Sequence, residues 1–481
     1  MLGTLFPDLG IATQSLIRAA YGVLMAATLL QALPEARRFF VSERWGGYAK
    51  SQPDVDLIQN PLVMPVLFGL WMAAAAAIAV GWWMPWPAIV NLVLCRYFFL
   101  HMRWKGVLRG MGAPGFIAYW LGAVVTLLEV TRRWTPSVLP LALLAAQVDF
   151  AFLMASAGIY KFTSGYPRNH GMELGLCNPM WGYWWRAYVK QRPSSVLFWT
   201  MNQLAWATEV VGALLMLVPA TRELGASLII LSFIFIATQI RLGFLTEMVM
   251  VCGLIFMSPS HSIGRWLESA LGSPAAVTVT PDPVLATVLA VAIRGYLILL
   301  PLAYAGLYYN FYARRALPSP LQTMLERYTN FFGIILWRVF SVDLVNFFIR
   351  IFRVRGAERV PIGPLGTWPR FNHVGEMICL TSLFTTLKYY PGNDRLFQER
   401  LFRYARTLPR EPGEPLVFAY VSVRKQADRF EWVTVGEFEV DPAAQTIEER
   451  WFDRSISPRA AHAVSPVFEG TAPGSYRPAT P

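Results

Sequence analysis

The clearest pattern in this sequence is a series of long apolar segments separated by shorter polar ones. A hydrocarbon core about 30 Å thick needs roughly 20 residues of helix, and a helix satisfies its own backbone hydrogen bonds there. The pattern therefore predicts about nine membrane-spanning helices. They cover residues 15–34, 61–83, 85–101, 114–131, 138–160, 196–219, 224–241, 244–258 and 284–308. The third carries Arg96 and the eighth is short, so either could be a partial or re-entrant segment.

The pattern changes near residue 310, where the long apolar runs stop and charge rises. Residues 331–355 mix arginines and an aspartate with aromatic and aliphatic residues, which predicts an amphipathic helix at the membrane surface. Farther on, "DRLFQERLFRYARTL" predicts a helix. Alternating β-branched and aromatic residues predict strands in "PLVFAYVSVRK", "RFEWVTVGEFEV" and "TIEERWF".

The expected fold class is an all-α polytopic membrane bundle followed by a small α+β domain on the cytoplasmic side. The last residues are rich in proline, glycine, serine and threonine, which is typical of disordered chain. The predicted divisions are the helical membrane domain 1–310, the interfacial helix and linker 311–356, the α+β domain 357–460 and the disordered tail 461–481.

Composition supports the membrane prediction. Hydrophobic residues make up 55% of the 481 residues and charged residues 15%, against roughly a quarter charged in soluble domains. The net charge of +12 lies in Lys and Arg residues that flank the apolar segments, so no nucleic-acid partner is expected. The loops after the first, third and fifth segments are strongly basic, which predicts a cytoplasmic location for them and for the C-terminal region. We expect a multi-pass protein of a cell membrane, the bacterial inner membrane.

The cysteines and histidines indicate no metal site. The four cysteines are scattered without CxxC spacing, and the five histidines are equally dispersed. The sequence also lacks HExxH, GxSxG, Walker and GxGxxG motifs, which removes the most common soluble enzyme classes. Chemistry is therefore expected from charged residues inside the apolar segments, where they are costly and usually face a cavity or another helix.

Three such residues are candidates for catalysis: Lys161, Glu209 and Asp149. A lysine amine desolvated at the mouth of an apolar cavity loses proton affinity and can act as a base near neutral pH, and the two acids would orient it or tune its charge. Asp149 and Lys161 are twelve residues apart in sequence, about 18 Å along a helix, so they cannot pair directly. The alternatives are structural: the lysine extends to the headgroups, and the acids join helices through a buried ion pair or hydrogen bond.

Four further residues are candidates for binding a lipophilic cofactor. Arg96 and His101 lie in the third apolar segment, and Trp181 and Trp184 lie in the long loop after Lys161. Loops of this length are often functional, and the aromatic rings could line a site for a flat lipophilic ring. The alternative is an interfacial role, with the tryptophans as an anchor, Arg96 extending toward the headgroups and His101 at the interface.

The residues around Lys161 also resemble a known family. "AQVDFAFLMASAGIYKF" is similar to the membrane segment of the HTTM group, which includes the vitamin K-dependent gamma-carboxylases, where a pattern like Q-x-x-x-x-Y-x-x-A-G-x-x-K ends in the lysine regarded as the catalytic base. "LHMRWKGVLRGMGAPGFIAYWLG", "LAWATEVVGALLMLVP" and "FIATQIRLGFLTEMVMVCGLIFMSP" resemble other segments of the family. Where the family shows Asp-Trp and then a glycine after the lysine, this chain has Tyr166 and Gly171 as loose equivalents. The resemblance covers roughly residues 15–310.

This resemblance implies a function. Lys161 would be the base that acts on a reduced quinone such as a vitamin K-like hydroquinone, with Glu209 as the intramembrane acid. The enzyme would use oxygen to add carbon dioxide to glutamate in a protein or peptide partner. The alternative is a non-enzymatic membrane assembly or maturation factor, similar to lipase-maturation or DoxX-like bundles, whose C-terminal domain docks a client protein. Membrane lipid and a client protein or peptide are the expected partners.

Overall fold

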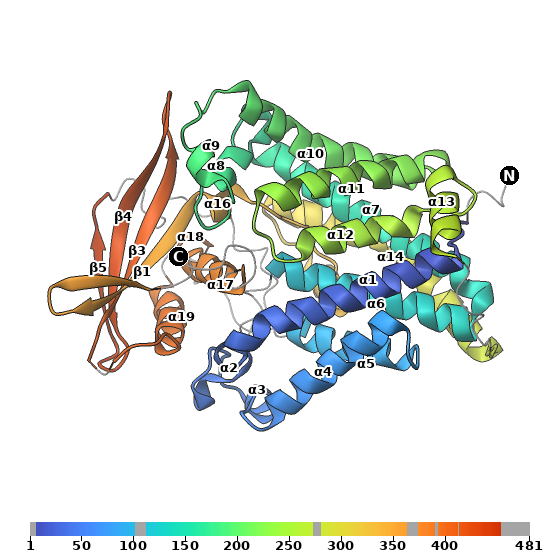
Figure 1. The fold of residues 1–481 in the computed structure, drawn as a ribbon, viewed down its shortest axis with the longest axis horizontal. Helices are drawn as coiled ribbons and strands as arrows, with labels where there is room; N and C mark the ends of the chain where they lie inside the picture. Colours follow the sequence, from blue (N-terminus) through green and yellow to red (C-terminus); the bar gives the residue numbers. More distant parts are fainter. Residues whose placement is uncertain are drawn as a thin grey trace.

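Long helices form one part of the molecule and an antiparallel sheet forms the other, as Figure 1 shows. The computed structural model describes residues 6–101, 112–272, 280–362, 374–389, 393–411 and 413–453. The bundle contains α1 (Ile11–Ala32), α4 (Val63–Val80), α5 (Trp86–Cys95), α6 (Gly112–Trp134), α7 (Leu139–Ser164), α10 (Val196–Leu217), α11 (Arg222–Gln239), α12 (Leu245–Gly253) and α14 (Pro283–Ala313). The shorter helices are α2 (Ala36–Phe40), α3 (Pro53–Ile58), α8 (Met172–Leu176), α9 (Trp185–Tyr188), α13 (Ser262–Leu271), α15 (Ser319–Phe332) and α16 (Val342–Val345).

Each of the nine predicted apolar segments contains a helix, but nine membrane spans are not confirmed. Within the described ranges, six helices are long and apolar enough to cross a membrane: Ile11–Phe40, Val63–Val80, Pro114–Trp134, Pro136–Ser164, Pro219–Gln239 and Pro283–Ala313. Helices α5 and α12 are apolar but short. Helix α10 is outside the six although it has 22 residues, because its middle carries Asn202, Gln203 and Glu209.

The outer surface of the bundle is compatible with a membrane protein. Helix α14 shows this best, because its exposed side chains include Val284, Val288, Val291, Ile298 and Leu302. These positions recur at three-, four- and seven-residue intervals and so form one apolar stripe along the helix. A continuous apolar stripe of this kind is unfavourable in water and normally contacts lipid or another protein.

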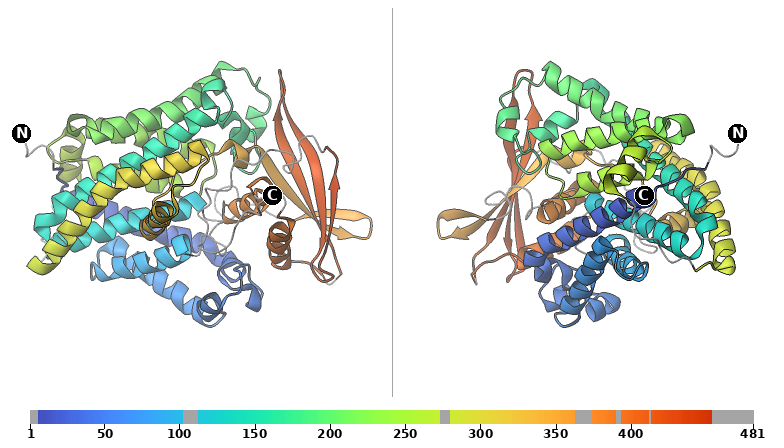
Figure 2. Two further views of the ribbon diagram at one scale, coloured as in Figure 1. Left: turned by 180° about the vertical axis from the view of Figure 1, so that it is seen from behind. Right: turned by 45° about the vertical axis from the view of Figure 1, so that its right-hand side comes forward.

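The second part of the molecule is a five-stranded antiparallel sheet in the order β2-β1-β3-β4-β5. Its strands are β1 (Phe347–Arg355), β2 (Glu358–Ile362), β3 (Leu416–Lys425), β4 (Phe430–Asp441) and β5 (Thr446–Trp451). Helices α17 (Val374–Phe384), α18 (Thr386–Tyr389) and α19 (Asp394–Arg406) lie beside it (Figure 2). Phe384 of α17 packs on Phe418, Tyr420 and Phe438 of the sheet, so this α+β unit has its own aromatic core. The predicted helix at 394–408 and the three predicted strands are confirmed as α19 and β3 to β5.

The predicted interfacial helix over residues 331–355 is wrong. Helix α15 ends at Phe332, a largely irregular segment follows, and the end of this stretch is strand β1, which lies between β2 and β3 in the sheet. In "FFIRIFRVR" the apolar Ile349 and Ile351 alternate with Arg350, and this period of two fits a strand instead of a helix. The sheet therefore begins before the predicted boundary at residue 357.

The loops of the bundle fall at two ends. The loop after α1 contacts the α+β unit, where Arg38 pairs with Glu376 at 2.8 Å and donates from Nε to the Thr407 hydroxyl at 2.9 Å. The loop after α7 does so too, because Asn178 donates to the carbonyls of Val345 and Phe347 at 2.8 Å. The N-terminus lies at the opposite end of the bundle (Figure 1). The loops after the first and fifth predicted spans thus both contact the α+β unit.

Candidate functional site

Lys161 and Glu209 form a buried ion pair inside the bundle. Lys161 lies near the C-terminal end of α7, Glu209 lies in α10, and the lysine Nζ donates a hydrogen bond to Glu209 Oε1. The residues are 3% and 2% exposed. A charge that is this well buried is tolerated when an opposite charge and hydrogen bonds compensate for the lost water.

A glycine brings the two helices close enough for this contact. Gly158 lies nearly one turn before Lys161, and a Cβ atom there would be 2.6 Å from Val210 Cγ2 and 2.9 Å from the Trp206 carbonyl. A larger residue at this position would force α7 and α10 apart. The approach of the two backbones explains how a lysine at a helix end reaches an acid instead of extending to solvent.

The hydrogen-bonding capacity of the pair is not filled. Glu209 Oε2 is buried and has no hydrogen-bond partner among the residues that the structure describes. An ammonium group has three donor protons, and the bond to Glu209 Oε1 uses one of those on Lys161. A buried polar atom without a partner is costly, so the pair could make further hydrogen bonds with a polar group.

Tyr166 extends this site toward the α+β unit. It lies in a short 3-10 turn, Tyr166–Arg168, just after α7, and its hydroxyl donates to the Phe340 carbonyl at 2.8 Å. Burial, together with the nearby negative charge of Glu209, raises the pKa of Tyr166 well above its ordinary value. Tyr166 therefore stays a neutral hydrogen-bond donor to Phe340 and lies close enough to Glu209 to be affected by its charge.

The segment that carries Phe340 passes through the core of the bundle. The backbone N–H of Trp337 donates to the Ser156 hydroxyl of α7 at 3.0 Å, and the Trp337 ring is stacked on Phe233 of α11 with centroids 6.5 Å apart. Phe340 has a positive φ of 61°, an uncommon conformation for an aromatic residue that the surrounding contacts must hold. Sequence reasoning missed this segment because its apolar residues were assigned to the interfacial helix.

A cavity of about 170 Å³ lies where this segment meets the sheet side of the molecule. Phe340, Arg338 and Trp181 contribute to its wall. Trp181 is buried, and its indole N–H has no partner among the described residues. The Arg338 guanidinium lies 6.0 Å from the ring centroid of Tyr160, the residue directly before Lys161 in the sequence. The ion pair itself lines neither this cavity nor the larger one described below.

Asp149 is held apart from the ion pair. Its Oδ2 atom accepts hydrogen bonds from Trp120 Nε1 of α6 at 2.7 Å and from the Tyr296 hydroxyl of α14 at 2.8 Å. The carboxylate thereby joins three helices through neutral donors. The structure brings together two of the three predicted catalytic residues, Lys161 and Glu209, and places Asp149 elsewhere.

The four residues predicted to bind a cofactor do not form one site. Arg96 lies in a π-helical turn, Arg96–His101, and its guanidinium donates to the Phe331 carbonyl and lies 4.8 Å from the Phe331 ring centroid. The side chain of His101 lies outside the part of the structure that is described. Trp184 is 60% exposed, and its Nε1 donates to the Thr238 carbonyl at 2.9 Å. Trp181 and Trp184 line different cavities.

The described residues contain no group of three or more His, Cys, Asp or Glu side chains that could hold a metal ion. The four cysteines are buried and free. No protein-family model, curated protein or solved structure matches this chain. The function is therefore argued from the geometry of the site and from the motifs quoted above.

Proposed function

We propose that this chain is an integral membrane enzyme of the vitamin K-dependent gamma-carboxylase-like class, in which Lys161 and Glu209 form an acid–base pair that acts on a reduced quinone. The observation that carries the proposal is the buried pair with unfilled hydrogen-bonding capacity. A purely structural ion pair is expected to have its remaining oxygens and protons satisfied. Buried titratable groups whose hydrogen bonds are incompletely satisfied are candidates for functional sites.

The residues of the pair fit a ligand that carries a hydroxyl group. Glu209 Oε2 can accept a hydrogen bond from a hydroxyl, and the unused protons of Lys161 can donate to an oxygen that becomes negative. When bound, a reduced quinone would supply the electrons and the reactive oxygen chemistry. Glu209 and Lys161 would supply the proton transfer.

The proton balance of the pair determines what Lys161 can do. To act as a base, Lys161 must first give its ammonium proton to Glu209, whose Oε1 already accepts its hydrogen bond, and this transfer leaves a neutral pair. In the neutral pair the amine accepts a proton from a hydroxyl, and the ammonium that forms is held beside Glu209. The Tyr166 hydroxyl bonds to Phe340, which lines the smaller cavity, so a polar group would approach the pair from this side.

The proposed setting is a cell membrane, and specifically the bacterial inner membrane. The six apolar helices and the exposed apolar stripe of α14 support a membrane location. The proposed partner is a protein or peptide that docks near the α+β unit, and membrane lipid surrounds the bundle.

The test uses the full-length chain, purified in detergent, with vitamin K hydroquinone as the probe. Bound quinone is measured by extraction and mass spectrometry, and oxidation of the hydroquinone is measured with oxygen present. In Lys161→Met we expect quinone to be retained and oxidation to fall by about 100-fold or more, the usual contribution of a general base. The matched control is Lys190→Met, which removes an exposed lysine from the loop after α7 and should leave both quantities unchanged.

Two results would overturn the proposal. One is wild-type protein that neither retains nor oxidises the hydroquinone, and the other is oxidation that is equally fast in Lys161→Met. The first result would favour the alternative, a membrane assembly or maturation factor. Glu209→Gln separates the two members of the pair, because it keeps the volume of the side chain and removes its ability to take up the lysine proton.

A further inference from the structure

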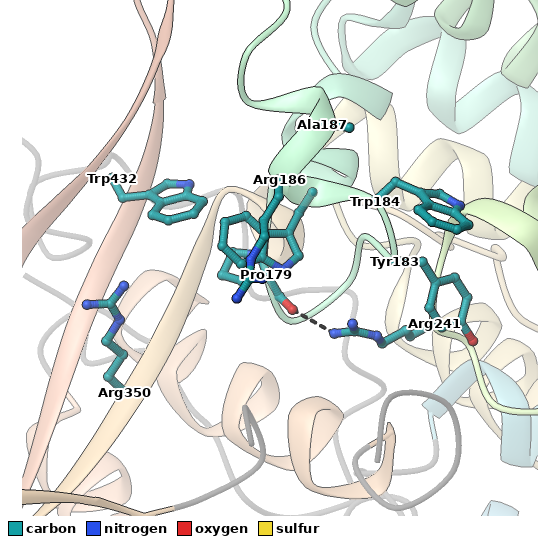
Figure 3. A pocket seen from close by; sticks show the side chains of 9 residues that line it. Pro179, Tyr183, Trp184, Arg186, Ala187, Arg241, Arg350 and Trp432 are labelled. Atoms are coloured by element: carbon teal, nitrogen blue, oxygen red, sulfur yellow. Dashed lines mark hydrogen bonds between the residues drawn. The ribbon is translucent and has the colours of Figure 1, made fainter. Parts of the chain in front are cut away.

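A larger cavity, of about 560 Å³, lies between the bundle and the sheet and is separate from the Lys161 site. Three arginines from three different elements contribute to it: Arg186 of α9, Arg241 just after α11, and Arg350 of β1 (Figure 3). On β1 the alternation of the strand turns Arg350 to the face opposite the buried Ile349 and Ile351. The cavity thus collects positive charge from parts of the chain that are far apart in sequence.

These arginines have no acidic partner in the described part of the chain. The described residues around the cavity are Pro179, Tyr183, Trp184, Trp185, Arg186, Ala187, Arg241, Arg350 and Trp432, with no aspartate or glutamate among them. Arg241 Nη1 donates to the Pro179 carbonyl at 2.7 Å, but its Nε atom is buried and has no hydrogen-bond partner. Elsewhere in the molecule arginines commonly pair with carboxylates, as Arg38 does with Glu376 at 2.8 Å. The positive charge of the three guanidinium groups is therefore not compensated by a carboxylate in the cavity wall, and the cavity is suited to binding an anion.

Aromatic residues complete the wall and add another unsatisfied donor. The rings of Trp185 and Trp432 have their centroids 4.7 Å apart. Trp432 Nε1 is buried and has no partner among the described residues. Arg241 lies over the Tyr183 ring at 5.3 Å and Arg186 over the Trp185 ring at 5.1 Å, so stacking on aromatic faces holds the guanidinium groups in place.

The cavity lies beside surfaces that are suited to lipid chains. Helix α11 belongs to the six apolar helices and ends at Gln239, two residues before Arg241. Its exposed side chains include Leu231, Ile234 and Phe235. The indole of Trp184 bonds to the end of this helix at the Thr238 carbonyl. Tryptophan and arginine at the end of an apolar helix are typical of headgroup depth.

We propose that this cavity binds the phosphate ester of an anionic phospholipid headgroup. Arginine is well suited to phosphate because its planar fork donates two parallel hydrogen bonds, and basic pockets next to apolar helices bind anionic headgroups. The exposed apolar face of α11 favours a lipid over a free phosphate ester, because the acyl chains of a lipid can lie along it. This inference does not depend on the quinone chemistry of Lys161.

The experiment uses the full-length chain in neutral detergent. Binding of phosphatidylglycerol, phosphatidylcholine and soluble glycerol phosphate is measured by native mass spectrometry and by competition. The main variant is Arg186→Gln with Arg350→Gln, since both side chains are exposed and their loss should not impair folding. Each basic side chain near a lipid surface contributes roughly fivefold to affinity, so the double variant should bind phosphatidylglycerol about 25-fold more weakly. Arg192→Gln is the matched control, because Arg192 is exposed in the same loop and does not line the cavity.

Arg241→Gln is a second variant that tests the same site from the bundle side and should also weaken binding. The proposal is supported if phosphatidylglycerol binds more tightly than phosphatidylcholine and only the cavity variants remove the difference. It is overturned if the double variant binds phosphatidylglycerol as wild type does, or if the two lipids bind equally. If soluble glycerol phosphate binds as tightly as phosphatidylglycerol, the ligand is a free phosphate ester, and the proposal that it is a lipid is wrong.

Discussion

Lys161 and the three arginines of the larger cavity are positive charges set among apolar and aromatic groups, but their charge is compensated differently. Lys161 is buried and paired with Glu209 inside the bundle. Arg186, Arg241 and Arg350 line an open space without a carboxylate among its described residues. The first arrangement carries its counter-charge within the chain, and the second requires an anion from outside.

This difference indicates what each region can do. A paired lysine and glutamate can exchange a proton without any change in net charge, which suits acid–base chemistry in a low-dielectric interior. Unpaired arginines at the edge of the bundle cannot lose a proton at physiological pH, so they suit binding. Removing a charge should therefore have different consequences in the two regions. In the bundle it leaves a buried partner without a counter-charge and lowers stability, whereas in the cavity it lowers the affinity for a ligand.

The largest expected effect comes from separating the buried pair. Lys161→Met leaves Glu209 buried without its partner and should lower the free energy of unfolding by about 3–5 kcal/mol. The double variant Lys161→Met with Glu209→Leu removes both charges and should recover most of that loss, because apolar residues can replace a buried ion pair at little cost. Chemical unfolding in detergent measures both. A double variant as unstable as the single one would show that the pair is not an isolated unit.

The close approach of α7 and α10 gives the next effect. Gly158→Ala places a Cβ within 3 Å of backbone atoms of α10 and should destabilise the bundle by about 1–3 kcal/mol, the usual cost of overpacking. The helices would also separate and lengthen the contact between Lys161 and Glu209. The control is Gly295→Ala in α14, where a Cβ meets nothing within 4 Å and alanine is the better helix former. Equal stability of the two variants would contradict this account.

A smaller effect is expected at Asp149, the buried acid that is satisfied by neutral donors. Asp149→Asn keeps an oxygen that can accept from Trp120 and Tyr296, so the loss should be about 1 kcal/mol, the difference between a charge-assisted and a neutral hydrogen bond. Hydroquinone oxidation should be unchanged in this variant. If oxidation falls as far as expected for Lys161→Met, Asp149 belongs to the same site and the separation drawn here is wrong.

The smallest effect concerns Lys388 in the α+β unit, a half-buried lysine with neutral acceptors. Its Nζ donates to the Asp343 carbonyl at 2.8 Å and to Asn346 Oδ1 at 2.9 Å, while burial lowers its pKa to about 8. The unfolded chain then holds this proton at pH values where the folded chain has lost it, so stability should rise with pH above about 8. The rise from pH 8 to pH 9 should be about 1 kcal/mol or less, since one proton contributes at most about 1.4 kcal/mol per pH unit. Lys388→Met should lack this rise in thermal unfolding, and an identical slope in both proteins would contradict the assignment.

The sequence predicted the elements correctly where short-range patterns of apolar and polar residues determine them. The long apolar runs became helices, and the alternation in β3 to β5 became strands. Strand β1 was missed because "FFIRIFRVR" offers apolar residues at both helical and strand spacing, and pairing with β3 decides between them. Arg350 was therefore not recognised as a side chain on a sheet face.

The candidate site depends more on contacts between distant segments. Lys161 and Glu209 were each recognisable as charges in apolar surroundings, but their pairing across 48 residues depends on the Gly158 contact. Nothing in the local pattern assigns Asp149 to Trp120 and Tyr296 instead. The larger cavity needs α9, the end of α11 and two strands together. Such sites follow from tertiary packing, which local periodicity does not encode.

The most direct test of the central claim is the rate of hydroquinone oxidation at equal quinone occupancy in Lys161→Met and in its control Lys190→Met. If Lys161 is the base, the control oxidises the hydroquinone at the wild-type rate and Lys161→Met is slower by about 100-fold or more. If both variants retain quinone and oxidise it at the same rate, the Lys161–Glu209 pair is a structural ion pair and the proposed chemistry is wrong.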